Sequence, residues 1–199
     1  TASPSATASA SASATNTHTT SPTPSATPTA TPTETPTTTP TVPLAPDVFL
    51  ASSEFRANTT TAGAQIDPSV CRGADGRFAV AWGSSGHVFL QRYTADGSRS
   101  GGETQISSAS GATLPDVACN DTADLTIVWT GNDASGTGIR ARSLNATGGF
   151  TTGEVGVNTA TNGSQRDAAA CLAGDGSLVV VWDDQGSRIV ARRRTSIAA

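Results

Sequence analysis

Several residue types are missing or scarce in this chain of 199 residues. Methionine is absent, all the basic residues are arginines, and there is one tyrosine. The formal net charge of −4 leaves no basic footprint, so nucleic acid is not a predicted partner. No apolar run is long enough to span a bilayer, and no transmembrane segment is predicted. The chain begins at Thr1 without a methionine, so we expect a mature chain whose export signal has been removed.

The usual signatures of catalytic and metal sites are also missing. His18 and His87 are the two histidines and no Cys-x-x-Cys pair occurs, which argues against zinc. His87 lies beside two serines, but no Gly-x-Ser-x-Gly motif accompanies them. Three aspartates lack the spacing of a calcium loop and are interpreted as turn residues: Asp75, Asp124 and Asp175. We therefore predict no catalytic residue, no cofactor, no metal site and no enzymatic activity.

Most of the 11 prolines lie in residues 1–46, a tract of alanine, serine and threonine with Glu34 as its one charged residue. A Pro-Thr-x-Thr pattern places proline at every fourth position from Pro24 to Pro40. Proline fixes its own φ and favours an extended preceding residue, so the tract is predicted to be polyproline-II-like. Such stretches are typical of mucin-like stalks. The candidate O-glycosylation sites are Thr27, Thr29, Thr31, Thr33, Thr35, Thr37, Thr39 and Thr41.

Residues 47–199 form the predicted folded domain, which is organised around three apolar runs ending in tryptophan. These are the core strands 78–82, 125–129 and 178–182, ending at Trp82, Trp129 and Trp182. They recur at intervals of about 50 residues, which indicates a repeat architecture. We place the repeats at about 54–102, 103–153 and 154–199.

Each repeat is predicted to contain four short strands. The first opens at a glutamate, the second contains a cysteine, the third ends in tryptophan and the fourth is rich in arginine in two repeats. Asp75-Gly76 and Asp175-Gly176 predict hairpin turns before two of the tryptophan strands, whereas Ala123-Asp124 occupies that place in the middle repeat. No helical periodicity interrupts the pattern, so the domain is predicted to be all-β.

The repeats resemble a family of tandem repeats in bacterial secreted and surface proteins. The shared pattern is Pro-x-Val-Ala, Asp-Gly-x-Phe-Val-Val-Val-Trp, Ile-x-Ala-Arg and Gly-x-Glu-Phe, matched here over residues 54–194. The resemblance implies four-stranded blades of the β-propeller type. Propellers typically close with four to eight blades, so three repeats predict a ring shared between chains or an unclosed stack of blades. A β-trefoil-like domain with pseudo-threefold symmetry is the alternative.

The three cysteines allow one disulfide and a leftover thiol, or a bridge to another chain. They are Cys71, Cys119 and Cys171, and the sequence leaves their pairing open. Cys119 is one position closer to its tryptophan than the other two, which predicts that it points to the opposite face of its sheet. Buried, unpaired thiols are the alternative interpretation.

Two further features concern the surface. Asn-x-Ser/Thr sequons occur at Asn58, Asn120, Asn145 and Asn162. The last predicted strand is strongly basic, and its Arg188 and Arg192–Arg194 could pair with Asp183 and Asp184 or with another subunit.

Together these features predict an extracellular or cell-surface protein, of bacterial type, that contributes structure. We expect a self-assembling filament or surface layer carrying covalent glycans on the Thr/Pro-rich tract, because exposed strand edges promote strand addition. The alternative is a carbohydrate- or ligand-binding adhesin module on a mucin-like linker.

Overall fold

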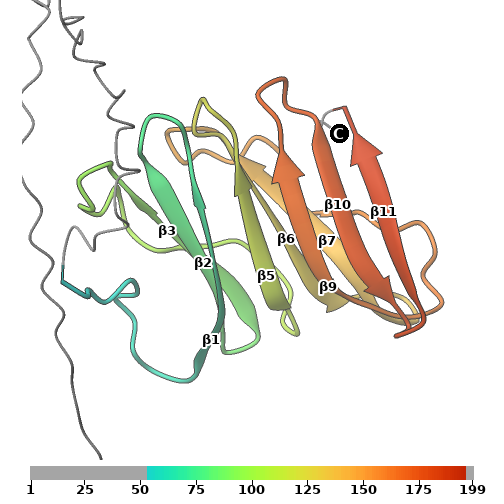
Figure 1. The fold of residues 1–199 in the computed structure, drawn as a ribbon. Helices are drawn as coiled ribbons and strands as arrows, with labels where there is room; N and C mark the ends of the chain where they lie inside the picture. The colour runs from blue at the N-terminus through green and yellow to red at the C-terminus, as the bar shows by residue number, and fades with distance from the viewer. Residues whose placement is uncertain (1–52, 196–199) are drawn as a thin grey trace, which may run out of the picture. The chain divides into compact units, whose positions relative to one another are not determined.

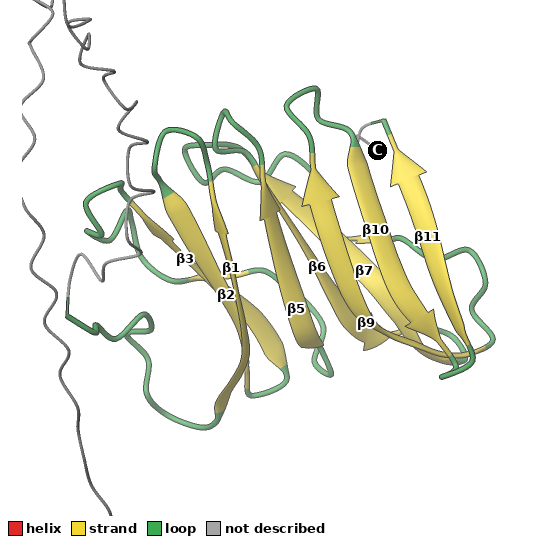
Figure 2. Cartoon of the chain, in the orientation of Figure 1, coloured by secondary structure: helices red, strands yellow, loops and turns green. Residues whose placement is uncertain are grey.

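The structure, a computed structural model, describes residues 53–195, and this part of the chain contains strands, turns and loops with no helix (Figure 2). The all-β prediction is therefore confirmed. Within the described residues there is accordingly no helix that could cross a membrane. The Thr/Pro-rich tract of residues 1–46, with the eight threonines predicted to be glycosylated, lies outside the described residues.

The strands form three antiparallel units, here called blades, which follow one another along the chain; the first is a separate sheet, and the second and third are joined into one seven-stranded sheet (Figure 1). The first blade contains β1 (Gln65–Arg72), β2 (Phe78–Ser84), β3 (His87–Tyr93) and β4 (Thr104–Gln105). The second contains β5 (Thr113–Cys119), β6 (Leu125–Asn132), β7 (Gly136–Leu144) and β8 (Val155–Gly156). The third contains β9 (Gly163–Leu172), β10 (Leu178–Asp184) and β11 (Arg188–Arg194). A short parallel pairing of β7 with β9 connects the second and third blades.

The blades pack face to face, and an apolar layer fills each of the two spaces between them. Ala81, Leu90 and Ile127 belong to the layer between the first and second blades. Val128 and Ile139 belong to the layer between the second and third. Because side chains alternate along a strand, β6 supplies Ile127 to one layer and Val128 to the other. The middle blade is thus buried on both faces. The uninterrupted apolar sequences of all three tryptophan strands predict this, but β10 is buried on one face only, because its Val179 is 39% exposed.

All three tryptophans are buried, which agrees with their predicted place in the core. Trp129 lies in the layer that faces the first blade, and Trp182 lies in the layer that faces the second. Trp82 is on the outward face of the first blade, because its neighbours Ala79 and Ala81 occupy the opposite face. Each tryptophan therefore lies on the same side of its blade. In the second and third blades this side faces the preceding blade, and in the first blade it faces outward.

The turns before the tryptophan strands follow one design in all three blades. Gly76 and Gly176 have positive φ, and their N–H groups donate to Gly73 and Ala173. Ala123 takes the same place in the second blade with a φ of 62°. The turn predicted from Asp-Gly thus also forms around Ala123, although its conformation is unfavourable for a residue with a Cβ atom.

The glutamate segments pair differently from the prediction. β4 and β8 are two residues long and pair with β3 and β7, so each completes the blade before it instead of opening the next one. The turn at Asp96-Gly97 folds the chain back beside β3, which makes this pairing local in sequence. Residues 54–58, predicted to be a strand, form none. The third blade has three strands within the described residues.

The alternative prediction of a β-trefoil-like domain is wrong. β1 contacts β5 and β5 contacts β9, in a row of blades whose first and third members lie at opposite ends (Figure 1). The stack consequently presents two outward sheet faces.

Candidate functional site

The two outward faces of the stack are the candidate site, and each has a distinct surface. We call the outward face of the first blade the leading face; it carries Val70, Arg72, Phe78, Val80, Trp82, Phe89, Gln91 and Tyr93, of which Trp82, Gln91 and Tyr93 are buried. We call the outward face of the third blade the trailing face; it carries Ala169, Cys171, Val179, Val181, Ile189, Ala191 and Arg193. These sets follow from strand alternation and from the residues that enter the two internal layers.

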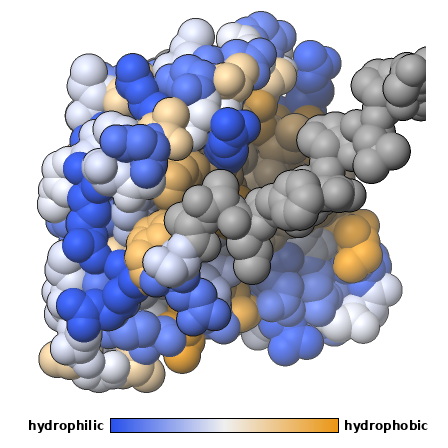
Figure 3. Space-filling view, turned by 60° about the vertical axis from the view of Figure 1, so that its left-hand side comes forward, coloured by the Kyte–Doolittle hydropathy of each residue, from blue (hydrophilic) through white to orange (hydrophobic). Residues whose placement is uncertain are grey.

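Both faces expose apolar side chains. Val70 on the leading face is 65% exposed, whereas Val117, at the matching position of the second blade, is 4% exposed. Ile189 on the trailing face is 79% exposed, whereas the matching Val88 and Ile139 are 0% exposed. Figure 3 brings the β1–β3 end forward and shows apolar surface gathered among polar residues there. The exposure therefore reflects the lack of a neighbouring blade within residues 53–195, not a more polar sequence.

Residues 54–60 border the leading face, although they form no strand. The Tyr93 hydroxyl donates to the Ala57 carbonyl at 2.6 Å, and the Phe55 ring lies 5.6 Å from the Tyr93 ring. In the other blades Arg142 donates to Ile106 and Arg192 donates to Val157, at 2.9 and 2.6 Å. The accepting carbonyl lies three residues after a glutamate in all three cases. Residues 54–57 thus occupy the position that β4 and β8 occupy relative to the blades that follow them.

Glutamates connect the successive outer segments, by which we mean residues 54–58 and the segments that contain β4 and β8. Each glutamate binds the loop that follows the preceding outer segment. The Glu103 carboxylate accepts hydrogen bonds from the N–H groups of Thr59 and Thr60 and from the Thr60 hydroxyl. Glu154 accepts the N–H and hydroxyl of Ser108, at 3.0 and 2.6 Å. Burial opposes ionisation of Glu103, but the hydrogen bonds from Thr59 and Thr60 dominate and lower its pKa. In the sequence these glutamates only mark the repeat, and no pattern there predicts their contacts.

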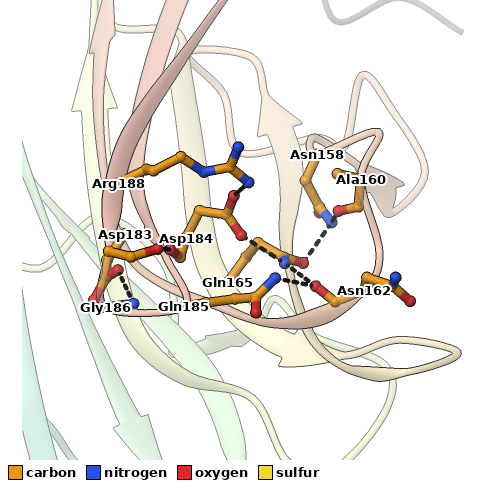
Figure 4. Close-up of polar contacts among 10 residues, drawn as sticks. Asn158, Ala160, Asn162, Gln165, Asp183, Asp184, Gln185, Gly186 and Arg188 are labelled. Atoms are coloured by element: carbon orange, nitrogen blue, oxygen red, sulfur yellow. Dashed lines mark hydrogen bonds and ion pairs between the residues drawn. The ribbon is translucent and has the colours of Figure 1, made fainter.

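A polar network supports the outer corner of the third blade (Figure 4). The Gln165 amide donates to Asp184 at 3.1 Å and to the Asn162 carbonyl at 2.9 Å, and its oxygen accepts from Asn158. Arg188 forms an ion pair with Asp184. The hydrogen bond from Gln165 lowers the pKa of Asp184 most, and Arg188 adds to this effect. The network fixes the loop after β8.

The first blade has a matching network with different groups. Gln65 donates to Ser84 Oγ at 2.9 Å and to the Ala62 carbonyl at 3.0 Å. Asn58 donates to Thr60, as Asn158 donates to Ala160. The loop around Asn58 is therefore built in the same way as the loop around Asn158.

Two of the three cysteines form a disulfide. Cys71 on β1 and Cys119 on β5 are joined, with their Cα atoms 5.8 Å apart, and Cys171 on β9 is free and exposed. The offset of Cys119 explains the pairing, because Cys71 points toward the second blade and Cys119 points back toward the first. A bridge across this loop stabilises the folded domain by about 2–4 kcal/mol.

The other residues singled out in the sequence mostly stabilise turns. Asp75 and Asp175 accept the N–H groups of Arg77 and Ser177, and Asp124 accepts the Thr122 hydroxyl. Two asparagines of the sequons, Asn120 and Asn145, also accept backbone N–H groups within their own turns. The sequon pattern by itself gives no sign of this structural role.

His87 and the arginines of β11 take part in local contacts. His87 Nδ1 lies 3.2 Å from Gln105 Nε2 and 3.4 Å from Ser107 Oγ. No salt bridge to His87 occurs among residues 53–195. Asp184 pairs with Arg188, as the sequence suggested, whereas Asp183 pairs with Arg166 at 3.3 Å. The described part of the chain contains no cluster of three histidine, cysteine or acidic residues that could hold a metal.

Comparison with known proteins places the chain in no family. No protein-family description and no curated protein matches the sequence. Among solved structures, an endo-arabinase from Bacteroides thetaiotaomicron VPI-5482 is similar, with a TM-score of 0.46 and 16% sequence identity. The match covers 70% of this chain and 59% of the arabinase chain. The chain thus spans less than two thirds of that enzyme.

Proposed function

We propose that this chain is a non-enzymatic extracellular structural protein that assembles with copies of itself into a surface filament or surface layer. The observation that carries the proposal is the pair of open terminal faces. Ile189 and Val70 are largely exposed at these faces, although the same positions between blades are buried. Exposed apolar sheet faces favour association.

The two faces differ from each other, which determines the kind of assembly. The leading face carries the tryptophan side of a blade, and the trailing face carries the opposite side. Contact between unlike faces is heterologous, and such contacts produce rings or open fibres. We propose an open assembly, in which every added copy again presents a free trailing face.

The disulfide and the sequence support an extracellular setting. Disulfides persist in oxidising compartments, and Cys71 is joined to Cys119. The Thr/Pro-rich tract of residues 1–46 has the composition of an O-glycosylated stalk. We propose that it carries glycans outside the assembled blades.

Two measurements test the proposal on the full chain. Light scattering after size exclusion and electron microscopy should show elongated assemblies whose mass rises with concentration. Intact mass before and after deglycosylation should report glycans. A single monomeric species at every concentration would contradict the assembly.

A further inference from the structure

We propose that the segment Glu54–Asn58 of one copy serves as the fourth strand of the third blade of another copy. The proposal rests on the proposed self-assembly and identifies the contact that joins two copies. In this junction the trailing face of one copy packs on the leading face of the next, with Phe55 and Arg56 paired along β11.

The backbone pairing follows from the two complete blades. β3 pairs Leu90 with Thr104, and β7 pairs Ala141 with Val155, each partner lying one residue after a glutamate. Ala191 of β11 matches Leu90 and Ala141, because all three lie at the same place in their repeats. Among the described residues β11 pairs with β10 and has no outer neighbour. Phe55, one residue after Glu54, is the corresponding partner for Ala191 of another copy.

A side chain completes each existing outer pairing. The N–H of Val88 donates to Ser107 Oγ at 3.0 Å, and the N–H of Ile139 donates to Asn158 Oδ1 at 2.8 Å. Both acceptors lie four residues after a glutamate, as does Asn58. Asn58 already donates from Nδ2 to the Thr60 carbonyl, in the way that Asn158 donates to Ala160. Its side chain is therefore held ready to accept the N–H of Ile189.

The glutamate contacts also continue across the junction. Glu103 binds the loop at Thr59–Thr60, and Glu154 binds the loop at Ser108. The next loop of this series begins at Thr159. Glu54 of the joining copy reaches this loop if it follows the same spacing. The junction thus repeats two contacts that the chain already makes internally.

The side chains of the leading and trailing faces match those that meet between the blades within one chain. Arg193 matches Arg92, whose guanidinium donates to the Ala146 carbonyl of the next blade at 3.0 Å. Cys171 matches Cys71, because they lie opposite Val179 and Ala79. Arg72 matches Cys119, because they lie opposite Phe78 and Leu125.

These matches predict which residues meet between copies. Cys71 and Cys119 face each other between the first two blades, so Cys171 of one copy should face Arg72 of the next. Arg72 is exposed and makes no salt bridge within the described residues. The substitution Arg72→Cys therefore places a second thiol opposite Cys171 if the junction is correct.

The experiment uses the full chain carrying Arg72→Cys, exposed to oxidised glutathione, which accepts the two electrons released as the disulfide forms. Facing thiols have an effective concentration of about millimolar, so cross-linking should be roughly 1,000-fold faster than at random encounter at micromolar protein. Non-reducing gels should show cross-linked oligomers, and peptide mapping should identify a disulfide between the thiol introduced at position 72 and Cys171. The double variant Arg72→Cys/Cys171→Ser should form no cross-linked oligomers.

Ala134→Cys is the matched control, because Ala134 is exposed in a turn of the second blade, away from both terminal faces. It should cross-link only at the random rate. If Arg72→Cys is no faster than this control, the junction is wrong. A second variant, Ile189→Asp, places a charge on the trailing face and should abolish assembly while the chain remains folded.

The outcomes separate the junction from the proposed function. Two results together would overturn the junction and leave the filament intact. The first is that Ile189→Asp still assembles, and the second is that assemblies of Arg72→Cys contain no disulfide to Cys171. Cross-linking that stops at a closed dimer would support the junction and overturn the open filament. A monomer whose Cys171 resists alkylation would show that the trailing face is covered within one chain, which overturns both.

Discussion

Glu103 and Thr60 are joined across 43 residues of sequence by two hydrogen bonds. The Thr60 N–H and Oγ1 donate to the glutamate carboxylate at 3.1 and 2.8 Å. Glu154 and Ser108 repeat this relationship one blade later. The repeat therefore uses its glutamate to attach each outer segment to the preceding one, and this attachment can be tested.

Replacing Glu103 by glutamine should destabilise the folded domain. The amide keeps one acceptor oxygen but loses the charge that strengthens the contacts with Thr59 and Thr60, so we expect a loss of about 1 kcal/mol. Urea unfolding of a dilute sample measures this loss. Glu54→Gln is the control, because Glu54 has no such partner among the described residues of its own chain and should change the free energy of unfolding little. Equal losses in both variants would contradict the assigned role.

The same carboxylate predicts how stability depends on pH. The pKa of Glu103 in the folded domain is lowered from its usual 4.5, so folding favours the ionised form. Its contribution is complete above that value and is lost as the pH falls through the lower folded-state pKa. Unfolding free energies measured from neutral pH down through this range should therefore decline less steeply in Glu103→Gln than in the parent chain. Parallel declines would show that Glu103 is not responsible.

The turn at Ala123 offers a stabilising change. Ala123 has a φ of 62°, at the position where the other blades have Gly76 and Gly176. A left-handed conformation costs a non-glycine residue about 1–2 kcal/mol, and the greater freedom of glycine in the unfolded chain offsets part of that cost. We expect Ala123→Gly to raise the free energy of unfolding by about 0.5–1 kcal/mol. Thermal unfolding measures the gain, and Gly76→Ala should show the reverse.

The sequence predicted the features that depend on alternation and period. The tryptophan strands and their burial follow from apolar runs, and the opposite orientation of Cys119 follows from its one-residue offset. The pairing of Cys71 with Cys119 additionally required knowing that neighbouring blades pack face to face. The open ends follow from the count of three repeats, but the residues that they expose, such as Val70 and Ile189, required the structure.

The sequence predicts the wrong blade for the outer strands β4 and β8, and the reason is physical. β4 and β8 are two residues long, and their sequences, Thr104-Gln105 and Val155-Gly156, share no apolar pattern. Their place is determined by the preceding turn and by the glutamate contacts with Thr59, Thr60 and Ser108. These contacts join residues more than 40 positions apart and leave no periodic signal. Residues 54–58 lack a preceding strand to pair with among the described residues, so a similar sequence forms no strand there.

Ile139 and Ile189 provide a matched test of the open trailing face. They occupy the same place in successive blades, yet Ile139 is 0% exposed and Ile189 is 79% exposed. Truncating a buried isoleucine to alanine costs about 2–5 kcal/mol, because it leaves a cavity as well as losing apolar contact. In dilute, monomeric protein Ile139→Ala should therefore lower the free energy of unfolding by that amount. Ile189→Ala should change it by no more than about 0.5 kcal/mol, as for a surface residue.

The difference in free energy of unfolding between Ile139→Ala and Ile189→Ala should become smaller at high protein concentration. When copies assemble, Ile189 becomes buried at the junction, so Ile189→Ala should then weaken assembly although the isolated domain is unaffected. Unfolding curves measured across a range of protein concentrations test both statements on the same variants. If Ile189→Ala destabilises the dilute monomer as much as Ile139→Ala does, the trailing face is covered within a single chain. If it alters neither stability nor assembly at any concentration, Ile189 lies outside the contact between copies.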